Sequence, residues 1–333
     1  MAEETANNDD TVTTRSMITF GFHNLNAQEV IGEIDRYLLY NLHIHLTLNI
    51  YYDTGFKFDD TLEMRNKIFE NKIHIKHFVI HNHCNIRDEH LLWFNLFVRF
   101  LQQPENHTTG NNSNNNNGET TTKHFGYMNF ASEYAGATLS LERANQLANA
   151  IRVNNNIESF KFYEHIASTK VFQPIWDVLL ETCVQDVHLV LELLESVKFV
   201  DRNTIDFKGL STNTSLNELH LSLSFMVQQN RKDFYNSIKT NRGLTNVDLY
   251  YQDHFLQDEE IELFKKMLRE NFTLLDFHPR SGLRDNNTQI LEQIGNLYAE
   301  INIQMRFNRM WKRYIIKRKE EATAAAAAAA NNT

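Results

Sequence analysis

The chain has 333 residues, of which 42% are apolar, and a formal net charge of −9. The apolar content is enough for a sizeable core, whereas the acidic balance argues against general nucleic-acid binding, which depends on clustered Lys and Arg. Cys84 and Cys183 give no disulfide framework, and no apolar run approaches the ~20 residues that cross a bilayer. We therefore expect a cytoplasmic or nucleocytoplasmic protein without a membrane span.

The N-terminal part begins with polar residues 1–15, which predict a disordered segment. Beyond it, alternating apolar residues predict strands, and apolar residues at helical spacing predict helices. These patterns predict a short strand at 17–22, a helix near 30–38, a strand at 42–52, a helix near 61–69, a strand at 73–82 and a helix at 88–101. Residues 103–124 are Asn-rich and have no apolar side chain to bury, so they predict a flexible low-complexity loop.

Strands and helices continue to alternate after the Asn-rich loop. The patterns predict a strand at 125–130, a helix near 139–152, a strand at 157–162, a helix at 168–182, a strand at 184–189, a short helix at 191–200, an irregular connection at 201–212, strands at 216–221, 244–249 and 274–279, and helices at 258–268 and 287–297. The acidic run at 258–260 suits the N-terminus of its helix.

Three of these later segments repeat one pattern. Starting at Asn213, Asn241 and Asn271, each reads Asn-x-x-apolar-x-x-apolar-x-apolar, except that Pro279 takes the last position of the third. One strand and one helix cannot bury their apolar sides alone, but stacked copies can. A period of about 30 residues therefore predicts an array of strand–helix units.

The same period extends through most of the chain. From one expected strand to the next, the middle apolar residue recurs after about 30 residues, with one longer step that contains the loop at 103–124. Removing roughly 20 loop residues restores the period. The residues that occupy this equivalent position are Leu46, Phe78, Met128, Phe160, Val187, Leu219, Val247 and Phe277.

This combination of Asn, apolar strand positions and helix resembles the leucine-rich repeats of the ribonuclease-inhibitor type, in a divergent, protist-like form. The resemblance implies an α/β fold, a curved horseshoe-shaped solenoid with parallel strands on the concave side and helices on the convex side. Residues 307–315 resemble the closing segment of many protist leucine-rich repeat proteins. We therefore expect a disordered N-terminus (1–15), a solenoid (16–300) with the loop 103–124, a C-terminal capping helix (301–320) and a disordered Ala/Asn tail (321–333).

The expected capping helix has an apolar side and many basic residues. Ile303, Phe307, Met310 and Tyr314 fall on one side at helical spacing. A basic amphipathic helix also suits calmodulin or acidic lipid. We favour the cap, because the last unit of an array needs its apolar face covered and the helix follows that unit directly.

The expected concave face carries the residues that alternate with the apolar strand positions. In its second half these residues are acidic, aromatic or His, which suits a patch that binds a protein with a basic contact surface. We hypothesise a non-enzymatic protein-interaction module or scaffold that needs no cofactor and no metal. The candidate contact residues are Tyr163, Asp186, His188, Glu218, His220, Asp248, Tyr250, Asp276 and His278.

Two alternatives remain open. A regulator of a small GTPase is implied because a GTPase-activating family shares this repeat type. A metal-dependent enzyme would use the cluster His74, His77, His81, His83 and Cys84. Along an extended strand every second residue is ~7 Å away, too far for one ion, and sequence motifs for known catalytic sites are absent.

Overall fold

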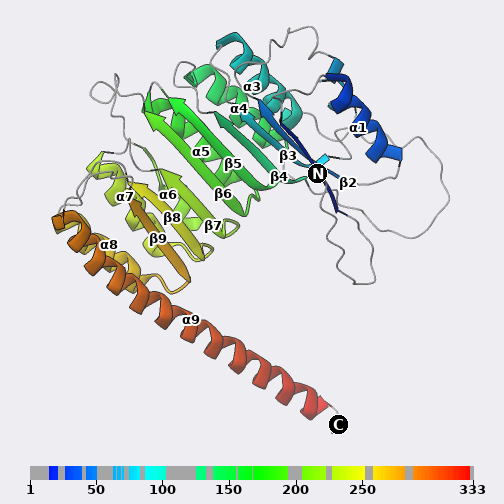
Figure 1. Cartoon of the computed structure of the whole chain (residues 1–333). Coiled ribbons are helices and arrows are strands. Elements are labelled where there is room, and N and C mark those ends of the chain that lie inside the picture. Colours follow the sequence, from blue (N-terminus) through cyan, green and yellow to red (C-terminus); the bar gives the residue numbers. More distant parts are fainter. Residues whose placement is uncertain are drawn as a thin grey trace.

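The strands form one parallel sheet in an α/β arrangement. The computed structural model describes residues 15–21, 27–39, 43–50, 63–64, 66–68, 70, 75–82, 87–102, 125–132, 138–154, 157–166, 168–193, 205–222, 227–251, 258–281 and 288–330. Within these ranges the sheet has nine strands in the order β1 to β9, so that each strand pairs with the next one along the chain. Helices lie on one side of the sheet and leave the other side open (Figure 1). We call that uncovered side the open face.

Strands and helices alternate as the sequence predicts. The strands are β1 (Arg15–Gly21), β2 (His43–Ile50), β3 (Ile75–Asn82), β4 (Phe125–Ser132), β5 (Ile157–Ile166), β6 (Asp186–Leu193), β7 (Glu218–Ser222), β8 (Asn246–Tyr251) and β9 (Asp276–Ser281). The helices are α1 (Ala27–Leu39), α3 (Arg87–Gln102), α4 (Leu141–Val153), α5 (Phe172–Glu181, after a 3-10 turn at Thr169–Val171), α6 (Lys208–Thr212), α7 (Gln228–Thr240), α8 (Asp258–Glu270) and α9 (Thr288–Ala330). Residues 63–64 and 66–68, inside the helix predicted near 61–69, and residue 70 just beyond it are also helical.

The pairing register confirms the equivalent position predicted from the period. Each of the eight middle apolar residues is the Cα partner of the next, from Leu46 with Phe78 through to Val247 with Phe277. The sheet begins one strand earlier, where Ile18 pairs with Leu46. A shift of one residue would turn each strand's apolar side chains outward, so burial on the helix side fixes this register.

Two predictions around residue 200 are wrong. The short helix expected from 191 does not begin there, because β6 continues to Leu193 and pairs with β5 as far as Ile166. Leu191 is fully buried there, as a core position of a strand requires. The connection expected at 201–212 contains the short helix α6, whose Leu210 packs into the core.

Aromatic side chains fill the core between the sheet and the helices. Phe78 of β3 stacks on Phe100 of α3 with ring centroids 4.4 Å apart, and Phe94 of α3 meets Phe130 of β4 edge-on at 5.9 Å. Phe130 stacks on Phe162 of β5 at 5.6 Å. Aromatic contacts of this kind add about 0.5–1.5 kcal/mol each beyond the burial of apolar area. The core is therefore continuous across neighbouring strand–helix units.

The repeated Asn residues form a hydrogen-bonded ladder inside the molecule. The Nδ2 group of Asn241 donates to the backbone O of Asn213 at 2.7 Å, and that of Asn271 donates to the backbone O of Asn241 at 3.1 Å. Each Oδ1 accepts from a backbone N–H three residues later, Leu244 at 2.7 Å and Leu274 at 3.0 Å. A buried carboxamide thus satisfies polar backbone groups of its own unit and of the preceding one.

Helix α9 supplies the last step of this ladder. Asn308 is fully buried, and its Nδ2 group donates to the backbone O of Asn271 at 3.0 Å and of Leu274 at 2.7 Å. Arg309 Nε donates to the backbone O of Leu275 at 2.9 Å. If another repeat unit followed, one of its backbone N–H groups would bond to this oxygen instead. These two side chains close the array, together with the buried Leu297, Ile301 and Met305 of the same helix.

The apolar side predicted for the closing helix does not pack on the last unit. Ile303, Phe307, Met310 and Tyr314 are 69%, 51%, 68% and 52% exposed. The helix also does not end at 320, because it runs unbroken to Ala330 through a polyalanine segment with the highest intrinsic helix propensity. Arg15, expected in the disordered N-terminus at 1–15, belongs to β1, and residues 321–330 of the expected disordered tail at 321–333 belong to α9. Residues 1–14, the loop at 103–124 and residues 331–333 lie outside the described residues. No helix in the described ranges is both long enough and apolar enough to cross a membrane.

Candidate functional site

The candidate site lies on the open face, over strands β5 to β9. Strand residues alternate between the core and this face, as the burial pattern of β5 illustrates. The pairing register aligns the outward residues of successive strands in rows. One row is Ser159, Asp186, Glu218, Asn246 and Asp276. The next row is Lys161, His188, His220, Asp248 and His278. These rows bring seven of the nine predicted contact residues onto four neighbouring strands.

His220 occupies the centre of the site, between two carboxylates. Its Nε2 atom lies 2.8 Å from Oε1 of Glu218, and its Nδ1 atom lies 3.1 Å from Oδ2 of Asp248. Asp248 is 5% exposed, so it orients His220 from the neighbouring strand β8 and does not itself present a surface carboxylate.

Asp186 adds a third carboxylate beside this group. Ser159 donates to its Oδ2 atom at 2.6 Å, whereas its Oδ1 atom is buried without a hydrogen-bond partner among the described residues. One ligand atom from each of Asp186, Glu218 and His220 lies within 4.8 Å of the others. Carboxylate and imidazole are ligands that zinc accepts, and Asp248 stands behind the imidazole as outer partners of metal-bound His do. Among the described residues, these three side chains are therefore the group that could hold a cation.

Aromatic rings lie next to the carboxylates. The His188 ring stacks on that of His220 with centroids 4.7 Å apart, and it lies nearly parallel to Tyr250 at 6.4 Å. Tyr163 lies on the neighbouring strand β5, where its ring meets His165 edge-on at 6.0 Å. The site thus gathers acidic and aromatic groups on β6 to β8, and Tyr163 stands at its border.

Asp276 and His278 form the opposite border, on β9. His278 Nε2 lies 3.0 Å from Oδ1 of Asp276, and Arg309 of α9 reaches the same oxygen at 3.4 Å. Sequence reasoning missed Arg309 as a neighbour of the site, because it places the residue in a cap and gives no path for its side chain. Both residues are nearly half exposed and remain accessible from the open face.

The first half of the open face has a different character. His45 stacks on His77 with ring centroids 3.8 Å apart, His77 on Tyr127 at 5.5 Å, and Lys161 Nζ lies 5.2 Å from the centroid of Tyr127. His77 and His81 of the sequence cluster at 74–84 lie on β3, whereas His74, His83 and Cys84 are outside the described residues. Among the residues described here, this half presents stacked rings and a cation instead of carboxylates.

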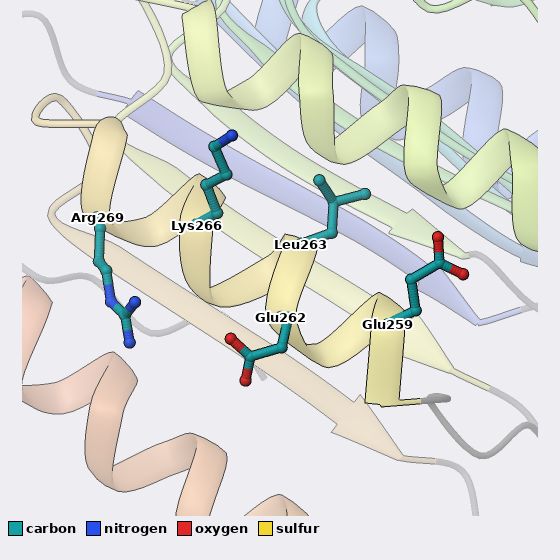
Figure 2. Close-up of a pocket in the computed structure, with 5 residues that line it drawn as sticks. All are labelled: Glu259, Glu262, Leu263, Lys266 and Arg269. Carbon is teal, nitrogen blue, oxygen red and sulfur yellow. The ribbon is translucent and has the colours of Figure 1, made fainter.

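A shallow hollow on the helix side does not compete with the open face. All of its lining residues come from α8 (Figure 2): Glu259, Glu262, Leu263, Lys266 and Arg269. Several of these charges have ion-pair partners, including Glu259 with Lys232 at 2.7 Å and Arg269 with Glu300 at 3.8 Å. Hydrogen bonds to Glu262 and Glu300 raise the pKa of Lys265 nearby. The hollow therefore has the character of a charged helix surface.

Comparisons with known proteins give no family. No protein-family model matches the chain, and no curated protein matches it. Among solved structures, the chain is similar to "Leiomodin-1 Actin-Binding Site 2 (ABS2)" at 14% sequence identity, with 54% of this chain and 83% of that chain covered and a TM-score of 0.27. A TM-score of this size does not indicate a shared fold, so the function has to be inferred from the open face itself.

Proposed function

We propose that this chain is a divergent leucine-rich repeat solenoid of the ribonuclease-inhibitor type, and a non-enzymatic module that binds a protein partner. Support for the repeat type comes from the Asn ladder, in which Asn241 and Asn271 occupy equivalent places and bond to equivalent backbone groups. The regular register of successive strands supports it further. In this proposal the open face is the concave face of the solenoid.

The observation that carries the binding proposal is the alignment of carboxylates on β6 to β9. Asp186, Glu218 and Asp276 stand in one row of the open face, and the buried Asp248 of the next row holds His220 beside them. Rings of His188 and Tyr250 provide flat, partly exposed contact area beside them. Such a surface is complementary to a partner with Arg and Lys at its contact, because opposite potentials steer encounter and fix orientation.

The scaffold makes binding of this kind efficient. Each open-face side chain is carried by a strand whose other side is packed in the core, so the strands position the contacts before a partner arrives. Little conformational entropy is then lost on association, which is the main advantage of a preformed surface. The partner is therefore expected to bind without large changes in the sheet.

Charge reversal at the two most accessible carboxylates tests the proposal. The side chains of Glu218 and Asp276 are 41% and 42% exposed, so Lys at either position leaves no buried charge. We expect the double variant E218K/D276K to weaken partner binding by at least about tenfold, because like charges then face each other. Quantitative affinity capture with wild-type and variant chains, followed by titration of the captured basic protein, measures the change.

A matched control carries the same charge change on the helix side. Glu142 of α4 and Glu270 of α8 are exposed, and E142K/E270K should leave the partner's affinity unchanged. Capture that is equal for both double variants would rule out the open-face patch as the binding surface. A metal content of one equivalent that is lost in E218K would instead assign the patch to a cation held by Asp186, Glu218 and His220.

A further inference from the structure

The distal part of α9 stands free of the body. Up to Asn308 the helix packs through buried residues, the last of them at the end of the Asn ladder. From 309 to 324 every residue is exposed, and Figure 1 shows this part extending away from the sheet beyond β9. A cap for the last unit needs only the first half of the helix, so the second half requires a different explanation.

Large apolar side chains form a stripe that begins on the outer side of the packed part and continues into this free part. Ile303, Phe307, Met310 and Tyr314 follow at spacings of four and three residues, which places them on one side of a helix. All four are at least half exposed. Trp311 adjoins the stripe, 47% exposed, with its ring stacked on Tyr314 at 5.6 Å. The stripe lies on a different side of the helix from the residues that pack on the body.

Basic side chains accompany the stripe. Arg306, Arg313 and Lys317 each follow a stripe residue by three positions, so they lie in a row beside it. The segment 306–319 contains further Arg and Lys residues and no Asp or Glu, although the chain as a whole has a net charge of −9. This segment is therefore locally basic within an acidic chain.

The positive charge beside the stripe indicates which kind of surface could cover it, a second copy of α9 or an anionic bilayer. A second copy of α9 would bring two basic rows together, and their repulsion opposes a helix pair. An anionic bilayer attracts the basic row and accepts aromatic and aliphatic side chains at the level of its headgroups, where Trp and Tyr are favoured. The segment projects beyond the body, so it can lie along a flat surface without a clash with the sheet.

We propose that residues 303–319 bind the surface of an anionic membrane. The helix lies in the plane of the interface, the stripe enters the boundary between headgroups and acyl chains, and the basic row contacts lipid phosphates and carboxylates. Binding through one helix is reversible, because it combines a limited apolar area with electrostatic attraction that falls off within a Debye length. This inference is independent of the proposed protein-binding role of the open face.

Trp311 provides a direct readout. The other tryptophans, Trp93 and Trp176, are 6% and 0% exposed, so their emission is already that of a buried ring. The full chain is mixed with vesicles of equal parts phosphatidylserine and phosphatidylcholine, and with vesicles of phosphatidylcholine alone. We expect a blue shift of the emission and co-sedimentation with the first vesicles only, and both effects should weaken as salt is raised.

Two variants separate specific from general effects. Reversal of the basic row in R306E/R313E/K317E should lower the vesicle partition coefficient by about a hundredfold or more. The control K170E/K208E/K266E makes the same charge change on exposed residues of the body and should bind as wild type. Circular dichroism should show that both variants retain their helix content.

Several results would overturn the inference. These are absence of binding to the anionic vesicles, equal binding to both kinds of vesicle, and equal loss in the two triple variants. Binding of the segment to an acidic protein such as calcium-loaded calmodulin, with no binding to vesicles, would assign the stripe to a protein groove. None of these outcomes affects the test of E218K/D276K, which addresses another surface.

Discussion

Replacement of Asn241 by Ala is expected to lower the free energy of unfolding by about 3 kcal/mol or more. The Asn241 side chain is fully buried. Its Nδ2 group donates to the backbone O of Leu210 at 2.6 Å and of Asn213 at 2.7 Å, and its Oδ1 atom accepts from two backbone N–H groups. Ala leaves these buried backbone groups without partners, at a cost of about 1–3 kcal/mol each where water cannot replace the carboxamide.

Urea unfolding followed by circular dichroism measures this loss. Asn236 lies in the same unit, exposed on α7, and N236A provides the control. It should change stability by no more than about 0.5 kcal/mol, since Ala favours a helix and no buried group is uncovered. If N241A proved as mild as N236A, the ladder would contribute little, and the period would have to be explained by apolar packing alone.

Removal of one partner of a buried ion pair between α7 and α8 is the second large effect. Arg231 and Glu260 are 7% and 0% exposed, and their contacts are bidentate, at 2.6 Å for Nε to Oε1 and 3.1 Å for the second nitrogen to Oε2. Tyr235 donates to the same carboxylate at 3.4 Å. In E260A the guanidinium remains buried without its counter-charge, and we expect a loss of about 3–5 kcal/mol.

The adjacent residue supplies the control for this prediction. Glu259 pairs with Lys232 at 2.7 Å, but its side chain is 74% exposed, so E259A should cost no more than about 1 kcal/mol. The double variant R231M/E260L removes both charges and should recover most of the loss, because apolar residues of similar size tolerate the same environment. Comparable urea midpoints for E260A and E259A would show that the pair is not desolvated in solution.

Features of the fold could be predicted from the sequence where the local pattern of apolar residues was strong. The register of the sheet could be predicted because apolar residues at a fixed period have one arrangement in which all are buried, as Leu219 and Val247 illustrate. The carboxylates of the open face could be assigned to their rows for the same reason. The contacts made by these carboxylates could not be predicted from the sequence. The alternation of apolar and polar residues does not reveal that Glu218 and Asp248 approach His220 from two sides.

The errors arose where two patterns competed on one segment. In α9 the stripe of Ile303, Phe307 and Met310 is more apolar than the side that packs, which includes Asn308. Apolar periodicity therefore indicated the wrong side of the helix, since the docking contact depends on hydrogen bonds of Asn308 and Arg309 that a hydrophobic pattern does not register. At 191–193, the described part of the helix predicted at 191–200, alternation and helical spacing could not be separated over so few residues.

Closure of the array by Asn308 and Arg309 also limits how copies of the protein can associate. A terminal strand with free backbone groups is a template for pairing with another chain, which leads to fibres or swapped dimers. Here α9 contacts β9, and Arg309 donates a hydrogen bond to the backbone O of Leu275. An incoming strand would begin to pair at this carbonyl. The same helix that terminates the array thereby opposes pairing of another chain at the start of this edge.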